Sequence, residues 1–202
     1  MNLPPIRWLA PVSGLTLSVC LGGCGSHDGW FPMKVGRHWT YQVRAGFDRK
    51  VESLQVIRPL TVASADGFEL SGPLGVSRLA WKHGTLYADS AANAGFNPPL
   101  PMLVPGVDLA KEIPRQVAVW HGRVIVMGKE QPGSAVLTER TESLDLGARK
   151  VPTILATLQM QVPGGKIELR SWYQEGIGLV QQEQRTNGAR IVQLQQLDRG
   201  GE

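Results

Sequence analysis

Residues 152–162 read PTILATLQMQV, and apolar and polar side chains alternate along most of this stretch. The apolar side chains at every second position are Ile154, Ala156, Leu158, Met160 and Val162, and Leu155 is the single exception. A period of two residues is typical of a β-strand with one buried face. The stretch therefore predicts a strand that turns one side toward a hydrophobic core.

Shorter stretches with the same period lie on both sides of residues 152–162. Trp39, Tyr41 and Val43 alternate with Thr40 and Gln42 in the first of them. Further strands are expected within residues 51–60, 68–71, 77–82, 85–89, 117–120, 123–127, 166–173, 179–185 and 190–197. No segment shows helical periodicity over three turns, and the best short helix candidate is residues 107–113, which Pro114 ends.

Glycine-containing dipeptides separate most of these predicted strands. Turns are expected at Asp66-Gly67, His83-Gly84, His121-Gly122, Gly164-Gly165 and Asn187-Gly188, and Asn-Gly is the strongest of these hairpin signals. Gly176 and Gly178 mark one more change of direction. Because these connections are short, neighbouring strands should pair antiparallel. The exception is residues 91–105, which are rich in Pro, Asn and Ala and are expected to form a long excursion without strand structure.

A different kind of signal precedes this domain. Residues 1–7 carry one positive charge, residues 8–22 are apolar or small without charge, and the sequence LGGC follows at residues 21–24. This order is typical of a lipoprotein signal peptide with cleavage between Gly23 and Cys24 and acylation, for example with palmitate, of Cys24. The apolar run is shorter than the roughly 20 residues that span a bilayer. We expect a signal peptide at residues 1–23, a lipidated tether at 24–29 and a β domain at 30–202.

Processing at Cys24 has consequences for the mature chain. Cys20 would leave with the signal peptide and Cys24 would carry lipid, so no disulfide is expected. Removing residues 1–23, which hold Arg7 and no acid, lowers the formal charge from +4 to +3, too little to indicate nucleic-acid binding. Two or more acyl chains hold a protein firmly on a membrane. In lipoproteins of Gram-negative bacteria, an Asp directly after the cysteine is the usual signal for retention in the inner membrane, and this chain has Gly25 there. The resemblance to such lipoproteins implies the periplasmic face of the outer membrane, and a Gram-positive source would change this expectation.

The sequence FPMKVGRHWTY at residues 31–41, close behind Cys24, resembles a motif of uncharacterised bacterial secreted proteins and lipoproteins. These proteins begin their mature domain with FPLxxGxxWxY and carry WYxxGVGLV near the C-terminus, where this chain has WYQEGIGLV at residues 172–180. Met33 and Ile177 depart conservatively from the two motifs. The resemblance implies an all-β domain with a strongly curved, half-barrel-like antiparallel sheet, and it implies no activity.

The candidate site residues are the aromatic side chains of these motifs. Trp39, Tyr41, Trp172 and Tyr173 combine a large apolar body with a polar tip, which suits either core packing or contact with a ligand. Core packing is the favoured interpretation. No catalytic motif is recognisable, no pair of His residues has metal-ligand spacing, and no cofactor is expected. Enzymatic activity is unsupported by the sequence.

The sequence thus indicates the location of the protein more clearly than its activity. We expect a non-enzymatic binding or scaffolding module of the cell envelope, bound to the membrane through Cys24 and to an envelope protein or lipid partner. The alternatives are a carrier that holds a lipid or a lipoprotein acyl chain in an apolar cavity, and an envelope hydrolase. A packed concave face would favour the scaffold, a continuous apolar cavity the carrier, and converging polar groups the hydrolase.

Overall fold

The computed structural model describes residues 27–106, 113–147 and 149–197, so the signal peptide, Gly23 and Cys24 lie outside the described residues. A short 3₁₀ helix, η1 (His27–Trp30), precedes twelve strands. The strands are β1 (His38–Ala45), β2 (Asp48–Val62), β3 (Ala65–Gly72), β4 (Gly75–Lys82), β5 (Thr85–Ala91), β6 (Ala94–Leu103), β7 (Arg115–Val126), β8 (Lys129–Asp145), β9 (Lys150–Val162), β10 (Gly165–Gln174), β11 (Gly178–Thr186) and β12 (Ala189–Gln196). No described helix has the length and apolar character needed to cross a membrane.

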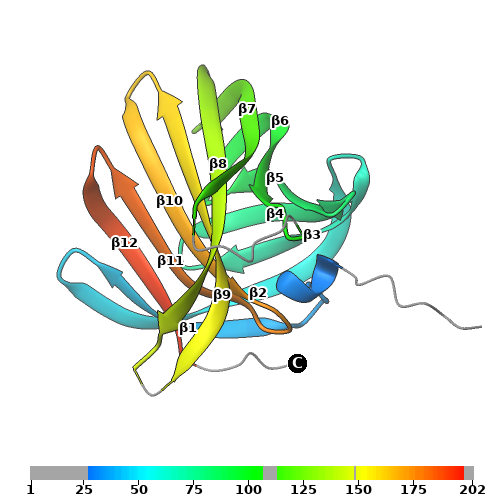
Figure 1. The fold of residues 1–202 in the computed structure, drawn as a ribbon. Coiled ribbons are helices and arrows are strands. Elements are labelled where there is room, and N and C mark those ends of the chain that lie inside the picture. The colour runs from blue at the N-terminus through cyan, green and yellow to red at the C-terminus, as the bar shows by residue number, and fades with distance from the viewer. Residues whose placement is uncertain (1–26, 107–112, 148, 198–202) are drawn as a thin grey trace, which may run out of the picture.

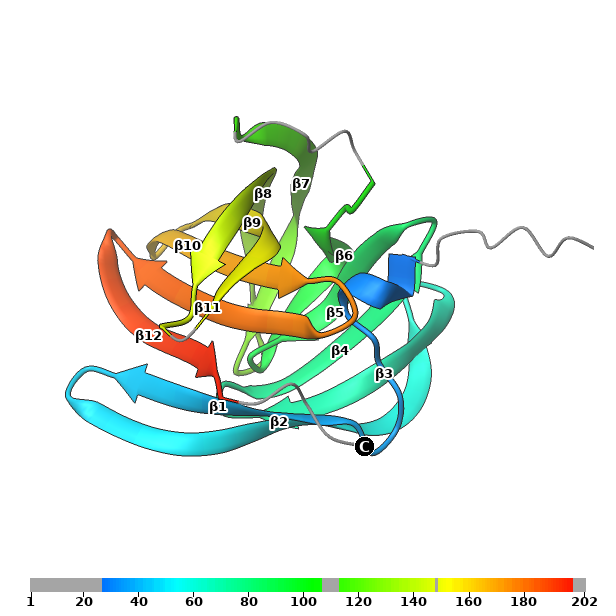
Figure 2. The same cartoon turned by 60° about the horizontal axis from the view of Figure 1, so that its bottom comes forward.

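The strands form one antiparallel sheet that closes on itself. Each strand pairs with its neighbours in sequence, and β12 returns to pair with β1 from Tyr41–Gln196 to Ala45–Val192. The prediction of a single all-β domain with a curved antiparallel sheet is confirmed. The sheet curves further than the expected half-barrel, because the first and last strands meet and complete a barrel (Figures 1 and 2).

The predicted turns are partly confirmed. His83-Gly84 and Asn187-Gly188 connect hairpins, with positive φ at both residues of each pair. Asp66-Gly67 and His121-Gly122 do not, because these pairs lie inside β3 and β7. The actual turns are at Ala63-Ser64 and Met127-Gly128.

Close packing explains why these glycines occur within strands. A Cβ atom at Gly67 would lie 2.6 Å from the carbonyl oxygen of Leu79, and one at Gly122 would lie 2.5 Å from that of Asn97. Glycine in a strand often marks such a close approach of another backbone, so the prediction of turns at these two dipeptides is wrong.

The predicted excursion at residues 91–105 is wrong, because most of it is strand β6. β6 pairs with β5 up to Leu103, but it pairs with β7 only from Gly95 to Asn97. Pro98, Pro99 and Pro101 follow, and proline has no N–H to donate to a neighbouring strand. The proline content therefore indicates one poorly paired edge of a strand. The helix predicted at residues 107–113 falls almost wholly outside the described residues.

Strand β9 confirms the pattern of residues 152–162. Its alternate side chains from Ile154 to Val162 belong to the main core inside the barrel. The exception, Leu155, lies on the outer face in a small second cluster with Leu144, Val151, Trp172 and Val180. Both faces of β9 are thus buried near its first half, which accounts for the break in alternation.

Because successive strands run in opposite directions, their connections alternate between two ends of the barrel. We call the end that holds the β1–β2, β3–β4, β5–β6, β7–β8, β9–β10 and β11–β12 turns the hairpin end. The other connections lie at the opposite end, which also receives η1, and we call it the closed end. In Figure 1 the β1–β2, β11–β12 and β9–β10 hairpins fan out on the side away from η1.

Candidate functional site

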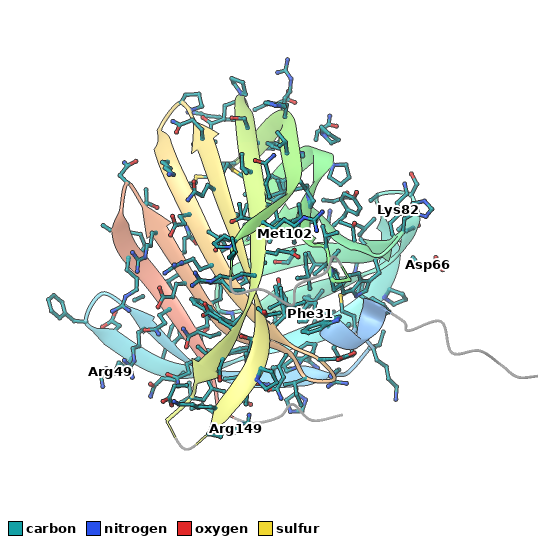
Figure 3. All side chains as sticks on the ribbon, viewed as in Figure 1. Phe31, Arg49, Asp66, Lys82, Met102 and Arg149 are labelled. Atoms are coloured by element: carbon teal, nitrogen blue, oxygen red, sulfur yellow. The ribbon has the colours of Figure 1, made fainter. Side chains whose placement is uncertain are left out.

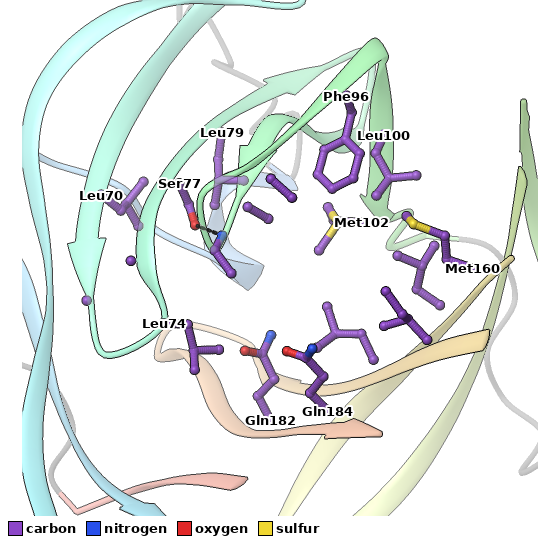
Figure 4. A pocket seen from close by; sticks show the side chains of 18 of the residues that line it. Leu70, Leu74, Ser77, Leu79, Phe96, Leu100, Met102, Met160, Gln182 and Gln184 are labelled. Atoms are coloured by element: carbon purple, nitrogen blue, oxygen red, sulfur yellow. Dashed lines mark hydrogen bonds between the residues drawn. The ribbon is translucent and has the colours of Figure 1, made fainter. Parts of the chain in front are cut away.

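The barrel encloses a cavity of about 360 Å³. Its walls are mainly aliphatic and aromatic side chains from most of the strands, and they include Leu70, Leu79, Phe96, Leu100, Met102, Leu158, Met160 and Leu169. Figure 4 shows Phe96, Leu100 and Met102 on one side of this space and Gln182 and Gln184 on the other. Cavities of this size and character hold small apolar ligands in many proteins.

The cavity reaches the hairpin end of the barrel. Its lining includes Pro73 and Leu74 of the β3–β4 turn, Ala92 of the β5–β6 turn, and Val126 and Val162, which end β7 and β9 at the hairpin end. Toward the closed end its lining residues are Phe31, Tyr173 and Leu179. The cavity is therefore a cup whose opening lies among the hairpin turns.

Phe31 forms the base of this cup. It follows η1 directly, and its side chain is buried inside the barrel (Figure 3). Its ring stacks on Trp39 with centroids 5.1 Å apart and meets Tyr173 edge-on at 6.0 Å. The indole N–H of Trp81 donates a hydrogen bond to the carbonyl oxygen of Phe31 at 3.2 Å. An aromatic plug in contact with three other aromatic residues closes this end.

The two sequence motifs meet at this plug. The indole N–H of Trp39 donates to the carbonyl oxygen of Ile177 at 2.7 Å, and the Tyr41 hydroxyl donates to that of Leu179 at 2.7 Å. The backbone N–H of Gly176 donates to the carbonyl oxygen of Gly29 at 2.7 Å. Residues about 140 positions apart in the sequence are thus held by direct hydrogen bonds. The motifs together form the closed end.

The structure separates the four candidate aromatic residues. Trp39 and Tyr41 are completely buried in the main core and do not line the cavity. Tyr173 belongs to the core and also lines the cavity. Trp172 lies on the outer face in the second cluster, where its indole N–H donates to a carboxylate oxygen of Glu142. Only Tyr173 is placed where it could contact a ligand in the cavity.

Polar groups in the cavity wall are few. Gln182 and Gln184 of β11 line it, and the Gln182 amide nitrogen donates to the Ser171 hydroxyl oxygen at 3.0 Å. Both glutamines face inward because the strand register shifts between Trp172 and Tyr173, opposite Val180. Such a β-bulge reverses which residues face each side of a sheet. Sequence periodicity alone assigns these glutamines to the outer face, since it assumes uninterrupted alternation from Leu179.

One carboxyl group is buried in the inner wall near the poorly paired β6–β7 edge. Glu139 of β8 is 1% exposed; one oxygen accepts a hydrogen bond from the backbone N–H of Val104 at 2.7 Å, and the other has no partner. Burial raises the pKa of Glu139 to about 7, and the hydrogen bond from Val104 opposes this rise. Burial also raises the pKa of Tyr173, with a smaller contribution from the charge of Glu139.

The raised pKa of Glu139 predicts a pH-dependent stability. Between the ordinary carboxyl pKa of 4.5 and about 7, the folded protein keeps the proton that the unfolded chain has lost. The contribution of this group to the free energy of unfolding should therefore be full below pH 4.5 and fall by about 3 kcal/mol as the pH rises to 7. Urea unfolding of wild type and Glu139→Gln across this range measures the effect. The difference between the two proteins should change with pH, and a constant difference would contradict the prediction.

Among the described residues, no group of three or more His, Cys, Asp and Glu side chains is arranged to hold a metal ion. His83 lies in the β4–β5 turn, as expected, whereas His121 lies within β7.

No protein family model matches the sequence, and no curated protein matches it. Solved structures do resemble it in fold. A proposed exported protein of Bacteroides fragilis, described as having a YmcC-like fold, is 14% identical with a TM-score of 0.52, over 86% of this chain and 99% of that one. A proposed lipoprotein of Parabacteroides distasonis is 14% identical with a TM-score of 0.50, over 83% and 96%. The hypothetical lipoprotein YmcC of Escherichia coli is 14% identical with a TM-score of 0.40, over 80% and 84%.

Proposed function

We propose that this chain is a lipid-anchored protein of the cell envelope that holds an acyl chain of a lipid or lipoprotein in its barrel. The observation that supports this function is the apolar cup of about 360 Å³, closed by Phe31 and open among the hairpin turns. A packed interior would have favoured the scaffold expected from the sequence, and the cup favours the carrier instead. The lining of the cup is mainly apolar, which favours a carrier over a hydrolase.

The size of the cup suits an acyl chain. Its volume is about that of a dozen water molecules in the liquid, and a methylene group is of similar size. Burying about ten methylene groups at about 0.8 kcal/mol each gives roughly 8 kcal/mol before the cost of association. We therefore expect affinity in the micromolar range or weaker, which suits a protein that must release its ligand.

The polar groups suggest how the ligand lies. Gln184 is nearer the hairpin end of β11 than Gln182, and its amide could donate to an ester, amide or carboxyl oxygen. The hydrocarbon would then extend past Leu169 toward Met102 and Phe31. This orientation leaves the headgroup outside the cup at the hairpin end.

The membrane anchor is part of this proposal. The sequence LGGC at residues 21–24 indicates acylation of Cys24, and Gly25 favours the outer membrane. The similar folds described as a lipoprotein and as an exported protein support an envelope location.

Cys24→Ala should abolish incorporation of a clickable fatty acid supplied to the cells, because it removes the acceptor thiol. Gel fluorescence of the purified protein measures this. Cys20→Ala is the matched control and should label like wild type. Equal labelling of the Cys24→Ala chain would exclude this anchor site.

A side chain that fills the cup should block ligand binding. Leu169→Trp adds a ring inside the cavity and displaces about three methylene groups, or about 2 kcal/mol, so the affinity should fall at least tenfold. Titration with cis-parinaric acid, a fatty acid that fluoresces when bound in apolar surroundings, measures the dissociation constant.

Val119→Trp is the control for this change. Val119 is half exposed on the outer face of β7, so its variant adds the same side chain without entering the cavity. It should bind the fatty acid like wild type. Unchanged binding by a folded Leu169→Trp protein would show that the cup is not the binding site.

A further inference from the structure

The turns and strand ends around the opening of the cup form a rim with a composition unlike the rest of the barrel. We define the rim as residues 44–52, 72–75, 91–94, 123–131, 162–166 and 183–190. It carries eight basic and four acidic side chains. The resulting charge of +4 equals the formal charge of the entire chain, so the remaining residues are neutral in sum.

Several of the rim cations lack an acidic partner. Arg44, Arg49, Lys129 and Lys166 form no ion pair with a carboxylate among the described residues. The acidic side chains of the rim are Asp48, Glu52, Glu130 and Glu183, and the last three pair with Lys50, Arg123 and two arginines, Arg185 and Arg190. Asp48 is the remaining acidic residue of the rim. The rim therefore presents a net positive surface. Figure 3 shows Arg49 on the side of the barrel opposite Asp66 and Lys82.

Large apolar side chains project from the tips of the same hairpins. Phe47, in the β1–β2 turn, is fully exposed, and Met127, in the β7–β8 turn, is 97% exposed. Beside Met127, Val126 is 41% exposed and also lines the cavity. An apolar surface thus continues from the inside of the cup to a hairpin tip.

We infer that the rim docks on a lipid bilayer with anionic headgroups, from which the cup takes its acyl chain. This inference rests on the proposed function. Exposing the methylene groups of an acyl chain to water is unfavourable, so the opening must meet an apolar phase during transfer. Exposed aromatic and apolar tips insert into the interface of a bilayer, and neighbouring Lys and Arg side chains bind anionic headgroups. The charge of the rim and its continuity with the cup favour a bilayer over a second copy of this positively charged chain.

Vesicle flotation tests the inference. The mature chain, residues 24–202 with Cys24→Ser, should be used, so that neither acylation at this residue nor the apolar segment at residues 8–22 can carry the protein to the vesicles. It should float with vesicles containing 30% phosphatidylglycerol and remain largely unbound with pure phosphatidylcholine vesicles. Replacing Phe47 and Met127 together with Ser should lower the bound fraction at least tenfold. Replacing Arg49 and Lys129 with Gln should weaken the preference for phosphatidylglycerol, because the net charge of the rim falls from +4 to +2.

The closed end offers a matched control. Val35 and Ile113 are exposed apolar residues outside the rim, near the start of β1 and of β7. A Val35→Ser, Ile113→Ser double variant should float like the parent. Equal flotation of the rim and control variants would overturn the inference. So would a dimer in solution, detected by analytical ultracentrifugation, that the Phe47 and Met127 replacements dissociate.

Binding of cis-parinaric acid in the absence of vesicles separates this inference from the proposed function. The rim variants should bind this soluble probe like the parent, because their side chains lie outside the deep part of the cup. Loss of flotation with intact fatty-acid binding supports rim docking. Flotation that depends on the rim in a protein that binds no fatty acid would contradict the proposed function and leave the membrane contact intact.

Discussion

Replacing Trp39 with alanine should lower the free energy of unfolding by about 3–5 kcal/mol, the usual cost of truncating a buried aromatic side chain. Trp39 has no exposed surface, stacks on Phe31 and donates a hydrogen bond to the carbonyl oxygen of Ile177. Truncation would remove the ring that stacks on Phe31 and leave the carbonyl oxygen of Ile177 without the indole N–H. Since whole domains have about 5–15 kcal/mol of stability, the variant should be poorly folded. Urea denaturation followed by circular dichroism measures the change.

Trp39→Phe separates the two contributions of this side chain. It keeps an aromatic ring against Phe31 and removes the indole N–H, so it should lose less stability than Trp39→Ala. The hydrogen bond alone accounts for about 1 kcal/mol. A Trp39→Ala protein whose melting temperature stays within a degree or two of wild type would show that this indole is not structural.

Gly178→Ala should lower the free energy of unfolding by about 2–6 kcal/mol for two reasons. Its φ of 109° is strained for any residue with a Cβ atom, which costs about 1–3 kcal/mol. The added Cβ would also lie 3.0 Å from the Phe31 ring and 3.3 Å from the Trp39 indole nitrogen, and such overpacking costs about 1–3 kcal/mol more. Thermal unfolding and chemical denaturation both report this loss.

Gly176→Ala is the matched control in the same turn. Gly176 also has a positive φ, of 76°, but a Cβ there would meet no atom within 4 Å. This variant should lose only the stability that the strained backbone conformation costs, about 1–3 kcal/mol. Equal destabilisation by the two substitutions would mean that contact with the plug contributes nothing at Gly178.

Much of the strand pattern could be predicted because alternation follows from one-sided burial. The alternating apolar and polar side chains of residues 39–43 and 152–162 form parts of strands β1 and β9, and Asn187-Gly188 connects a hairpin. The predictions of a turn at His121-Gly122 and of an excursion at residues 91–105 are wrong because contacts with distant parts of the chain explain the glycine and the prolines there. Gly122 lies within a strand because Asn97 passes too close for a side chain, and the prolines of β6 stand at an edge that β7 leaves unpaired. Neither neighbour is visible in the local sequence.

The candidate site was harder to predict than the fold. Trp39 and Tyr173 could be singled out from the two sequence motifs, but their contact through Phe31 spans more than 130 positions. Gln182 and Gln184 face the cup only because a bulge opposite Val180 reverses the alternation of β11. The burial of Glu139 likewise depends on side chains from other strands and on the backbone of Val104.

From local periodicity and turn chemistry, the chain alone specifies an antiparallel all-β domain and the approximate positions of many strands. These features depend on neighbours in the sequence, whose side-chain period and φ preferences are readable directly. Closure of the barrel, the aromatic plug and the open cup required the tertiary structure. They depend on the pairing of β1 with β12 and on the packing of Phe31 against Trp39 and Tyr173, and contacts between residues so far apart leave no periodic trace in a single sequence.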